Sequence, residues 1–174
     1  IKTVMFNTDS TLLDLHFDNF FWLNLVPEHF SKHHGVSEEQ AVAHVQSKYA
    51  QVHGTLDWYS INYWQAELKL DIPHLKRLIT DKIRLRPGAK QLLKALVVEG
   101  KQVLLVTNAH PISLKLKMQY VSIEKYFEQL ISSHQLHKAR TPKFQDAGAW
   151  RCALPVSPAG IPFQSRAEYR PRPV

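Results

Sequence analysis

The stretch Lys2–Asp14, which reads KTVMFNTDSTLLD, decides how the rest of the chain is interpreted. Its apolar run Thr3–Phe6 is typical of a buried β-strand. The small polar residues of Asn7–Thr11 follow directly, and Leu12 and Leu13 then return to apolar packing. Open α/β sheets hold their ligand sites at the carboxyl ends of strands. The stretch therefore predicts a strand that delivers polar groups to a site.

A second stretch, Lys101–Pro111 (KQVLLVTNAHP), has the same organisation. Val103–Val106 is expected to form another buried strand, and Thr107 and Asn108 come at its end. Two strands of this kind bring hydroxyl and amide groups to one edge of a sheet, and this arrangement suits an oxyanion such as phosphate.

The chain between these two strands is expected to be helical throughout. Helices are predicted over residues 18–34, 37–52 and 55–70, and from Pro73 to about Thr80. Pro27 is expected to kink or divide the first helix, whereas Ser37 and Gln40 have the spacing of a capping box. The aromatic residues of 58–64 suit either a packed helical core or a wall on which a purine base stacks.

The second half of the chain predicts an α/β fold with a parallel sheet. Helices are expected over Ala89–Val98 and from Pro111, with a short turn-like helix at Ile123–Phe127 and a third strand at Gln129–Ser133. A β-α-β-α-β order with short connections is typical of parallel strands joined by right-handed crossovers.

The two strand ends resemble motifs I and II of the haloacid dehalogenase-like (HAD-like) hydrolases. In these proteins the first motif is a strand followed by D-x-D-G-T, and the second is a strand ending in Ser or Thr. The segments TLLDLHFDNFFWLNLVPEHF, TLDWYSINYWQAELKLDI and LLVTNAHPISLKLK further resemble the bacterial GMP/IMP 5′-nucleotidases of that superfamily. The resemblance spans residues 1–134. It implies a partial Rossmann-like parallel sheet with an inserted all-helical cap, and a Mg²⁺-dependent phosphoric monoester hydrolase that acts on purine nucleoside monophosphates through a phospho-aspartate.

The resemblance assigns the catalytic positions to the loop after the first strand. Asp9 matches the residue that protonates the leaving oxygen and then activates water. Asn7 matches the nucleophile, and Asn7 and Asp9 match the positions that hold magnesium. An amide attacks phosphorus poorly and is a weak magnesium ligand, so turnover and metal binding are expected to be impaired. Ser10 replaces the motif glycine, and its side chain is expected to narrow the site.

The phosphate-binding positions that the resemblance implies lie further along the chain. Thr107 would bond a phosphate oxygen, and Asn108 would add an amide. The basic residue of the third motif stays open between Arg140, Lys143 and Lys138, because each suits a different alignment after the third strand. An arginine forks across two oxygens whereas a lysine is a compact charge, so these choices are not equivalent.

The resemblance also predicts the domain organisation. Residues 1–14 and 86–150 are expected to form a discontinuous and incomplete α/β core, with residues 15–85 as the helical cap. Residues 151–174 form a tail rich in arginine and proline. The family pattern of a later strand ending in two acidic residues is missing, so the chain is interpreted as truncated, or as shifted in reading frame near residues 137–145.

Composition narrows the classes of function. The net charge is +7, and the tail supplies +3 of it through four arginines and one glutamate. The other basic residues are scattered, so dedicated nucleic-acid binding is not favoured. A single cysteine and the lack of a long apolar run predict a cytoplasmic protein without a membrane span. Two alternatives to an enzyme remain, namely an inactive nucleotide- or phosphate-binding remnant and a basic interaction protein that acts through its tail.

Overall fold

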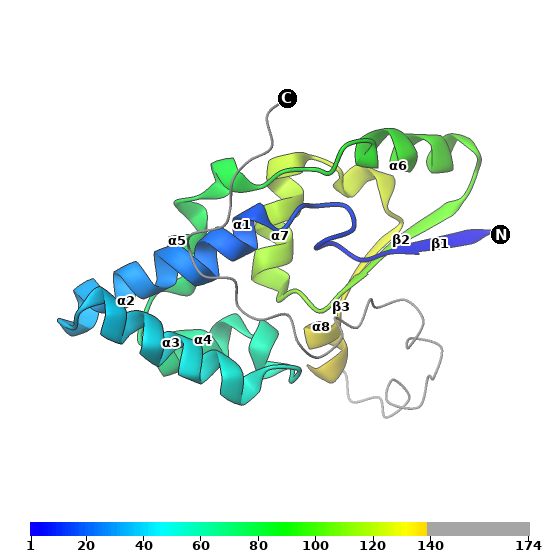
Figure 1. Ribbon diagram of the computed structural model, residues 1–174. Coiled ribbons are helices and arrows are strands. Elements are labelled where there is room, and N and C mark those ends of the chain that lie inside the picture. The colour runs from blue at the N-terminus through cyan, green and yellow to red at the C-terminus, as the bar shows by residue number, and fades with distance from the viewer. Residues whose placement is uncertain (139–174) are drawn as a thin grey trace. The chain divides into compact units, whose positions relative to one another are not determined.

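The computed structural model describes residues 1–138 of the chain. Three strands, β1 (Thr3–Phe6), β2 (Gln102–Thr107) and β3 (Gln129–Ser132), form one sheet in the order β1-β2-β3 (Figure 1). Both pairs are parallel, with Phe6 opposite Leu105 and Thr107 opposite Ser132. The parallel α/β sheet predicted from the strand patterns is confirmed.

The helices have the following bounds. Before β2 lie α1 (His16–Phe20), a π-helical turn (Phe21–Leu25), α2 (Val26–His34), α3 (Glu38–Val52), α4 (Ile61–Leu68), α5 (Ile72–Arg77) and α6 (Ala89–Val98), with 3₁₀ turns at Asp57–Tyr59 and Thr80–Lys82. After β2 come α7 (Pro111–Val121), a 3₁₀ turn at Glu124–Tyr126 and α8 (Ser133–Lys138). None of the helices in the described part of the chain is long and apolar enough to cross a membrane.

Two predicted helices differ in detail from those observed. Pro27 does not end the helical stretch, but the helix type changes at this point: a π-helical turn ends at Leu25, and α2 begins at Val26 with Pro27 in its first turn. The π-helical turn just before it widens the backbone at the point where the proline ring meets the preceding turn. The single helix predicted over 55–70 is wrong in extent, because the Ser60 hydroxyl accepts from the Tyr63 N–H at 3.2 Å and starts α4 there.

An aromatic cluster forms the core of the helical segment, by which we mean residues 16–82. Trp64 is 1% exposed, and its ring packs edge-on against Tyr49 with the ring centroids 5.0 Å apart. Its indole N–H donates to the Trp58 carbonyl at 2.9 Å, which gives the buried nitrogen a partner. Packing is thus the role of Trp64 in the structure, while base stacking by its neighbours stays a prediction.

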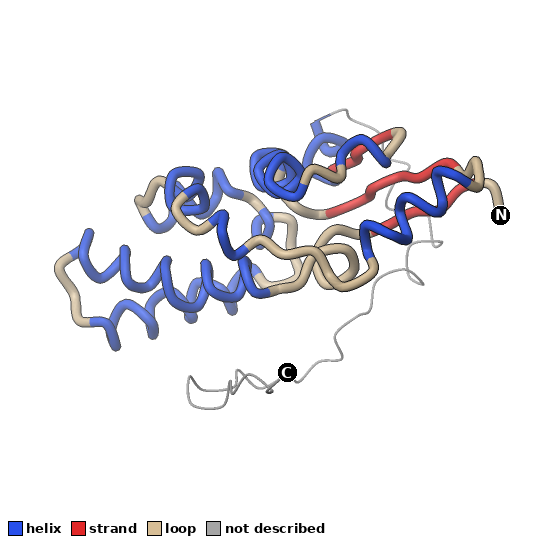
Figure 2. The backbone as a smooth tube through the Cα atoms, turned by 90° about the horizontal axis from the view of Figure 1, so that it is seen from above, coloured by secondary structure: helices blue, strands red, loops and turns tan. Residues whose placement is uncertain are grey.

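The helical segment lies beyond the carboxyl ends of the strands, as Figures 1 and 2 both show. The chain enters and leaves it through two connectors that run side by side. The Asp14 N–H donates to the Arg84 carbonyl at 3.1 Å, and the Arg86 N–H donates to the Leu12 carbonyl at 2.9 Å. Because α5 and α7 also pack together, side chains of the helical segment reach the strand ends where a ligand site was predicted.

Candidate active site

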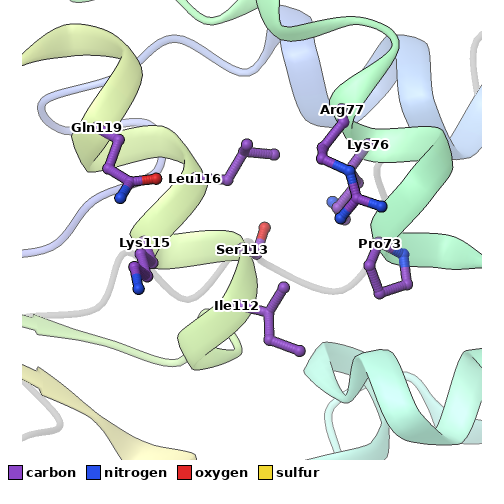
Figure 3. A pocket seen from close by; sticks show the side chains of 8 residues that line it. All are labelled: Pro73, Lys76, Arg77, Ile112, Ser113, Lys115, Leu116 and Gln119. Carbon is purple, nitrogen blue, oxygen red and sulfur yellow. The ribbon is translucent and has the colours of Figure 1, made fainter.

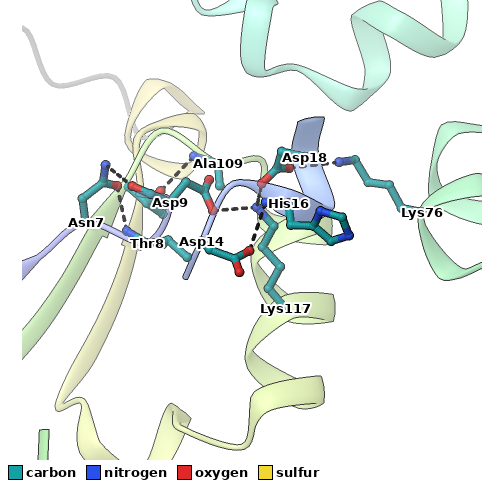
Figure 4. Close-up of polar contacts among 10 residues, drawn as sticks. Asn7, Thr8, Asp9, Asp14, His16, Asp18, Lys76, Ala109 and Lys117 are labelled. Carbon is teal, nitrogen blue, oxygen red and sulfur yellow. Dashed lines mark hydrogen bonds and ion pairs between the residues drawn. The ribbon is translucent and has the colours of Figure 1, made fainter. Parts of the chain in front are cut away.

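The side chain of Asn7, the first residue after β1, is hydrogen-bonded to the backbone of its own loop on both sides. The Asn7 carboxamide oxygen accepts from the Thr8 N–H at 2.8 Å, and its NH₂ group donates to the Asp9 carbonyl at 3.5 Å (Figure 4). Ser10 has φ = 60°, which is the left-handed region, and its carbonyl accepts from the Arg86 guanidinium at 2.7 Å. The motif glycine is therefore replaced where the backbone conformation favours glycine.

Asp9 belongs to a network of four charged side chains from four different elements. The Lys117 ammonium, on α7, lies 2.6 Å from Asp9 Oδ1 and 2.6 Å from Asp18 Oδ2. Asp18 is on α1, and its other oxygen lies 3.7 Å from the Lys76 ammonium on α5. Figure 4 shows Asp9 and Asp18 converging on Lys117. Two carboxylates and two ammonium groups balance, so the network needs no further charge to be neutral.

Burial and pairing compete in setting the pKa values of this network. Desolvation raises the pKa of Asp9, and the nearby Lys117 offsets only part of that rise. Desolvation acts on Asp18 in the same direction, but Lys117 and Lys76 together bring the pKa of Asp18 below its ordinary value. Desolvation would lower the pKa of Lys117, yet the two carboxylates raise it. Lys117 is therefore held as an ammonium.

For Lys76, burial outweighs pairing in setting the pKa. Its side chain is 4% exposed, and its ammonium lies 4.2 Å from the centre of the Phe21 ring and 5.0 Å from that of Phe17. Desolvation lowers the pKa of Lys76 to about 8, although Asp18 acts against this shift. The ring faces attract the cation, but they replace water only in part.

The sequence interpretation missed Lys117, Asp18 and Lys76 as members of the site. A signal for Lys117 is present in the sequence of α7. Ser113, Leu114, Lys117 and Met118 lie at positions i, i+1, i+4 and i+5, which share one side of a helix, and all four are buried. A lysine on an otherwise buried side requires an acidic partner nearby. Which carboxylate it meets depends on how α7 packs against α1, and the sequence alone does not give that.

Polar groups also gather at the ends of β2 and β3. Thr107 is 5% exposed, and its hydroxyl accepts from the Ala109 N–H at 3.1 Å. The Ser132 hydroxyl donates to the Ala109 carbonyl at 2.8 Å. Within residues 1–138, the buried Thr8 hydroxyl has no hydrogen-bond partner. Because β1 and β2 are parallel neighbours, Asn7, Asp9, Thr107 and Asn108 lie at one edge, as predicted.

The predicted basic residue of the third motif cannot be placed. Arg140 and Lys143 lie outside the described residues. Lys138 is the last residue of α8, and its side chain also falls outside the description.

The residues at this edge do not fit a magnesium ion as they stand. Magnesium prefers carboxylate and carbonyl oxygens in a near-octahedral set. Asn7 offers an amide that is already bonded within its own loop, and the Asp9 carboxylate is bonded to an ammonium. Residues 1–138 contain no group of three or more His, Cys, Asp or Glu side chains that could hold a metal. The donor set predicted at Asn7 and Asp9 is thus insufficient by itself.

Comparison with known proteins identifies the class. A family model for haloacid dehalogenase-like hydrolases matches residues 1–147, and the chain belongs to this family. It is 38% identical over 134 residues to the GMP/IMP nucleotidase YrfG of Escherichia coli K12, covering 77% of this chain and 60% of that protein. The Shigella flexneri protein of the same name matches equally. The chain therefore spans less than two thirds of the length of these relatives.

A solved structure supports the fold. The crystal structure of a HAD phosphatase from Thermococcus onnurineus superimposes with a TM-score of 0.68, at 23% identity, over 76% of this chain and 62% of that one. At that identity the likeness establishes the architecture, and the predicted HAD-like α/β fold is confirmed. The chemistry has to be argued from the residues at the strand edge.

Proposed function

We propose that this chain is a purine 5′-nucleotidase-type phosphatase domain that binds nucleoside monophosphates such as GMP and IMP but hydrolyses them very slowly. The observation that carries the proposal is the buried Lys117 ammonium, which holds Asp9 at the end of β1, beside the hydroxyl-bearing end of β2. The nucleotidase relatives, at 38% identity, support the choice of substrate.

The proposed binding mode uses the two strand ends. Thr107 and Asn108 offer a hydroxyl and an amide to phosphate oxygens, and Lys117 orients the Asp9 carboxyl beside them. Asp9 is suited to protonate the leaving oxygen, because desolvation raises its pKa, and general acid catalysis of this kind contributes about 10²–10⁴-fold. Asn7 stands where the nucleophile is expected, and its amide cannot form the phospho-aspartate.

Residues 15–85 are proposed to act as a cap that selects the substrate, with residues 1–14 and 86–150 as the core. The cap assignment is supported by the segment His16–Lys82, whose helices and turns include no strand and which lies beyond the strand ends. Tyr59, which is 40% exposed, and the neighbouring Trp58 are the aromatic side chains proposed to stack on the purine. A lid of this kind excludes water from the reacting groups.

A second candidate function is phosphate or nucleotide binding without turnover. It is favoured by the closed Asn7 loop, whose amide bonds its own backbone on both sides. The resemblance implies Mg²⁺ as cofactor, but no step is assigned to it because the described donors do not fit it. Interaction through the tail, residues 151–174, stays a prediction that lies outside the described residues.

The test compares four proteins: the chain itself, Asn7→Asp, Ser10→Gly and the double variant. Phosphate release from GMP and IMP is measured with and without Mg²⁺, and nucleotide binding is measured by calorimetry. We expect all four to bind nucleotide. Turnover should rise by roughly 10⁴-fold or more once a carboxylate nucleophile is restored, and Asp9→Asn in the double variant should remove that gain.

Three outcomes have distinct meanings. Turnover by the unaltered chain at a rate close to that of the double variant would show that another nucleophile exists and would overturn the role given to Asn7. Binding without turnover in every variant would favour the non-catalytic function. Loss of nucleotide binding in all four proteins would reject both candidates.

A further inference from the structure

A small cavity lies between α5 and α7. Its volume is about 220 Å³, and it is lined by Pro73, Lys76, Arg77, Ile112, Ser113, Lys115, Leu116 and Gln119 (Figure 3). Pro73, Ile112 and Leu116 form an apolar wall. Figure 3 shows the Arg77 and Lys115 side chains on opposite helices of this cavity.

The charged residues that line the cavity are all positive. None of the eight residues that line the cavity is acidic, and three of them are cations. Lys76 pairs with Asp18. Arg77 and Lys115 are exposed, and within residues 1–138 neither of them has an acidic side chain within ion-pair distance. Two cations of this kind beside an apolar wall attract an oxyanion.

The lining of the cavity includes none of the residues predicted at the strand edge, which are Asn7, Asp9, Thr107 and Asn108. Ile112, Leu116 and Gln119 are spaced three or four residues apart, so they share one side of α7. Lys117, which reaches Asp9, follows Ser113 by one turn on the same side of α7, so the cavity borders the charge network there, but its lining includes neither Lys117 nor Asp9. Lys76 borders both places, because it lines the cavity and its ammonium lies 3.7 Å from Asp18.

The size of the cavity restricts its occupant. Pockets for drug-sized ligands usually measure about 300–1,000 Å³, so a cavity of about 220 Å³ is small for a whole nucleotide. It suits an oxyanion that has a short apolar body. The Arg77 guanidinium matches a phosphate, phosphonate or carboxylate with two parallel hydrogen bonds, and Ser113 and Gln119 add a hydroxyl and an amide.

We propose that the cavity between α5 and α7 is a binding site for a small organic oxyanion with an apolar body, distinct from the proposed nucleotide site. Arg77 and Lys115 bind the charged group, and Pro73, Ile112 and Leu116 contact the apolar body. The proposal does not depend on catalysis at the strand edge.

The experiment titrates the full chain with three probes and follows its backbone amides in ¹H–¹⁵N spectra. Phenylphosphonate has an oxyanion and an apolar ring, inorganic phosphate has the oxyanion alone, and benzyl alcohol has the ring alone. We expect saturable shifts at residues of α5 and α7 with phenylphosphonate, weaker binding of phosphate, and no saturable binding of benzyl alcohol. Phosphate and carboxylate ligands are separated by repeating the titration with benzoate.

The variants Arg77→Gln and Lys115→Gln, singly and together, test the two cations. The double variant should weaken phenylphosphonate binding by about tenfold or more. Lys90→Gln together with Lys94→Gln is the control, because it removes two exposed charges from α6. Two results would overturn the proposal: shifts confined to Thr8 and residues 107–109, or equal affinity in the double variant and the control. Since the altered residues are exposed, the single variants keep the test usable if the double variant folds poorly.

Discussion

The residue types suit the local backbone conformation better in the helical segment than in the loop after β1. In the helical segment, Gly35 ends α2 at φ = 66°, and the Ser37 hydroxyl caps α3 by accepting from the Gln40 N–H at 3.2 Å. In the loop, Ser10 has φ = 60°, and the amide of Asn7 stands at the position that the resemblance assigns to the nucleophile. At Gly35 and Ser37 the helical segment has the residue that the backbone position favours, although Lys69 ends α4 at φ = 52°. The loop has a favoured residue at neither of its two positions.

This difference indicates that the helical segment is intact as a scaffold, whereas the loop that would carry the chemistry is altered. The helical segment keeps caps and a dense aromatic core around Trp64, which is 1% exposed. The loop keeps Asp9 and its partner Lys117, but Asn7 and Ser10 stand where the resemblance predicts the nucleophile and the motif glycine. If the comparison is correct, substitutions in the charge network should affect folding strongly, and substitutions that restore the loop should cost no stability.

The largest expected effect is that of Lys117→Met. The change leaves the Asp9 and Asp18 carboxylates with one fewer cation in a buried place, and breaking a buried ion pair in this way costs about 3–5 kcal/mol. Urea unfolding followed by circular dichroism measures the loss. Lys115→Met, at an exposed position of the same helix, is the matched control and should change stability by less than about 0.5 kcal/mol.

A second variant checks the cause of that loss. Adding Asp18→Asn to Lys117→Met removes one of the two stranded carboxylates, so part of the stability should return. A loss below about 1 kcal/mol in Lys117→Met would mean that the charge network contributes little to stability. The comparison between the two regions would then be wrong.

The next effect concerns pH and Lys76. Its pKa is lowered in the fold, from 10.5 to about 8, so between these values the unfolded chain binds more protons at this residue than the folded one. Stability therefore rises with pH across that window, and the cost of burying the charge is fully present below pH 8. The resulting change in the free energy of unfolding is on the order of 3 kcal/mol.

Unfolding free energies at several pH values between 7 and 10.5 measure this effect. The rise should be smaller in Lys76→Met by the contribution of that one residue. Lys82→Met is the control for losing a cation over an aromatic ring, since the Lys82 ammonium lies 4.4 Å from the centre of the Phe20 ring but is 26% exposed. Equal slopes in the parent chain and in Lys76→Met would show that Lys76 is not desolvated in solution.

Much of the fold was predictable because its signals are local. Apolar runs gave the strands, and Ser37 with Gln40 gave the start of α3. Asn7, Asp9, Thr107 and Asn108 were placed at one edge because parallel strands align their carboxyl ends. Asp18 was interpreted only as the beginning of a helix, since its partner Lys117 is 99 residues away. Contacts of that range depend on packing, and no local pattern encodes them.

Ser10→Gly has the smallest expected effect and tests the loop most directly. A non-glycine residue in the left-handed region costs roughly 1–2 kcal/mol. Glycine removes this cost, but part of the gain in stability is lost because glycine makes the unfolded chain more flexible. A net gain of about 0.5–1 kcal/mol should appear in urea unfolding. The Arg86 bond to the Ser10 carbonyl is unaffected, because it uses the backbone.

Ser122→Gly is the matched control, because Ser122 has φ = 53° at the end of α7. Both variants should gain stability for the same reason, because each replaces a serine that has a left-handed backbone conformation with glycine. Phosphate affinity, measured by calorimetry, separates them: it should rise only in Ser10→Gly if the Ser10 side chain narrows the site, as the resemblance predicts. Equal affinity in both variants would confine the effect of Ser10 to backbone strain, and the proposed slow turnover would then depend on Asn7 and not on Ser10.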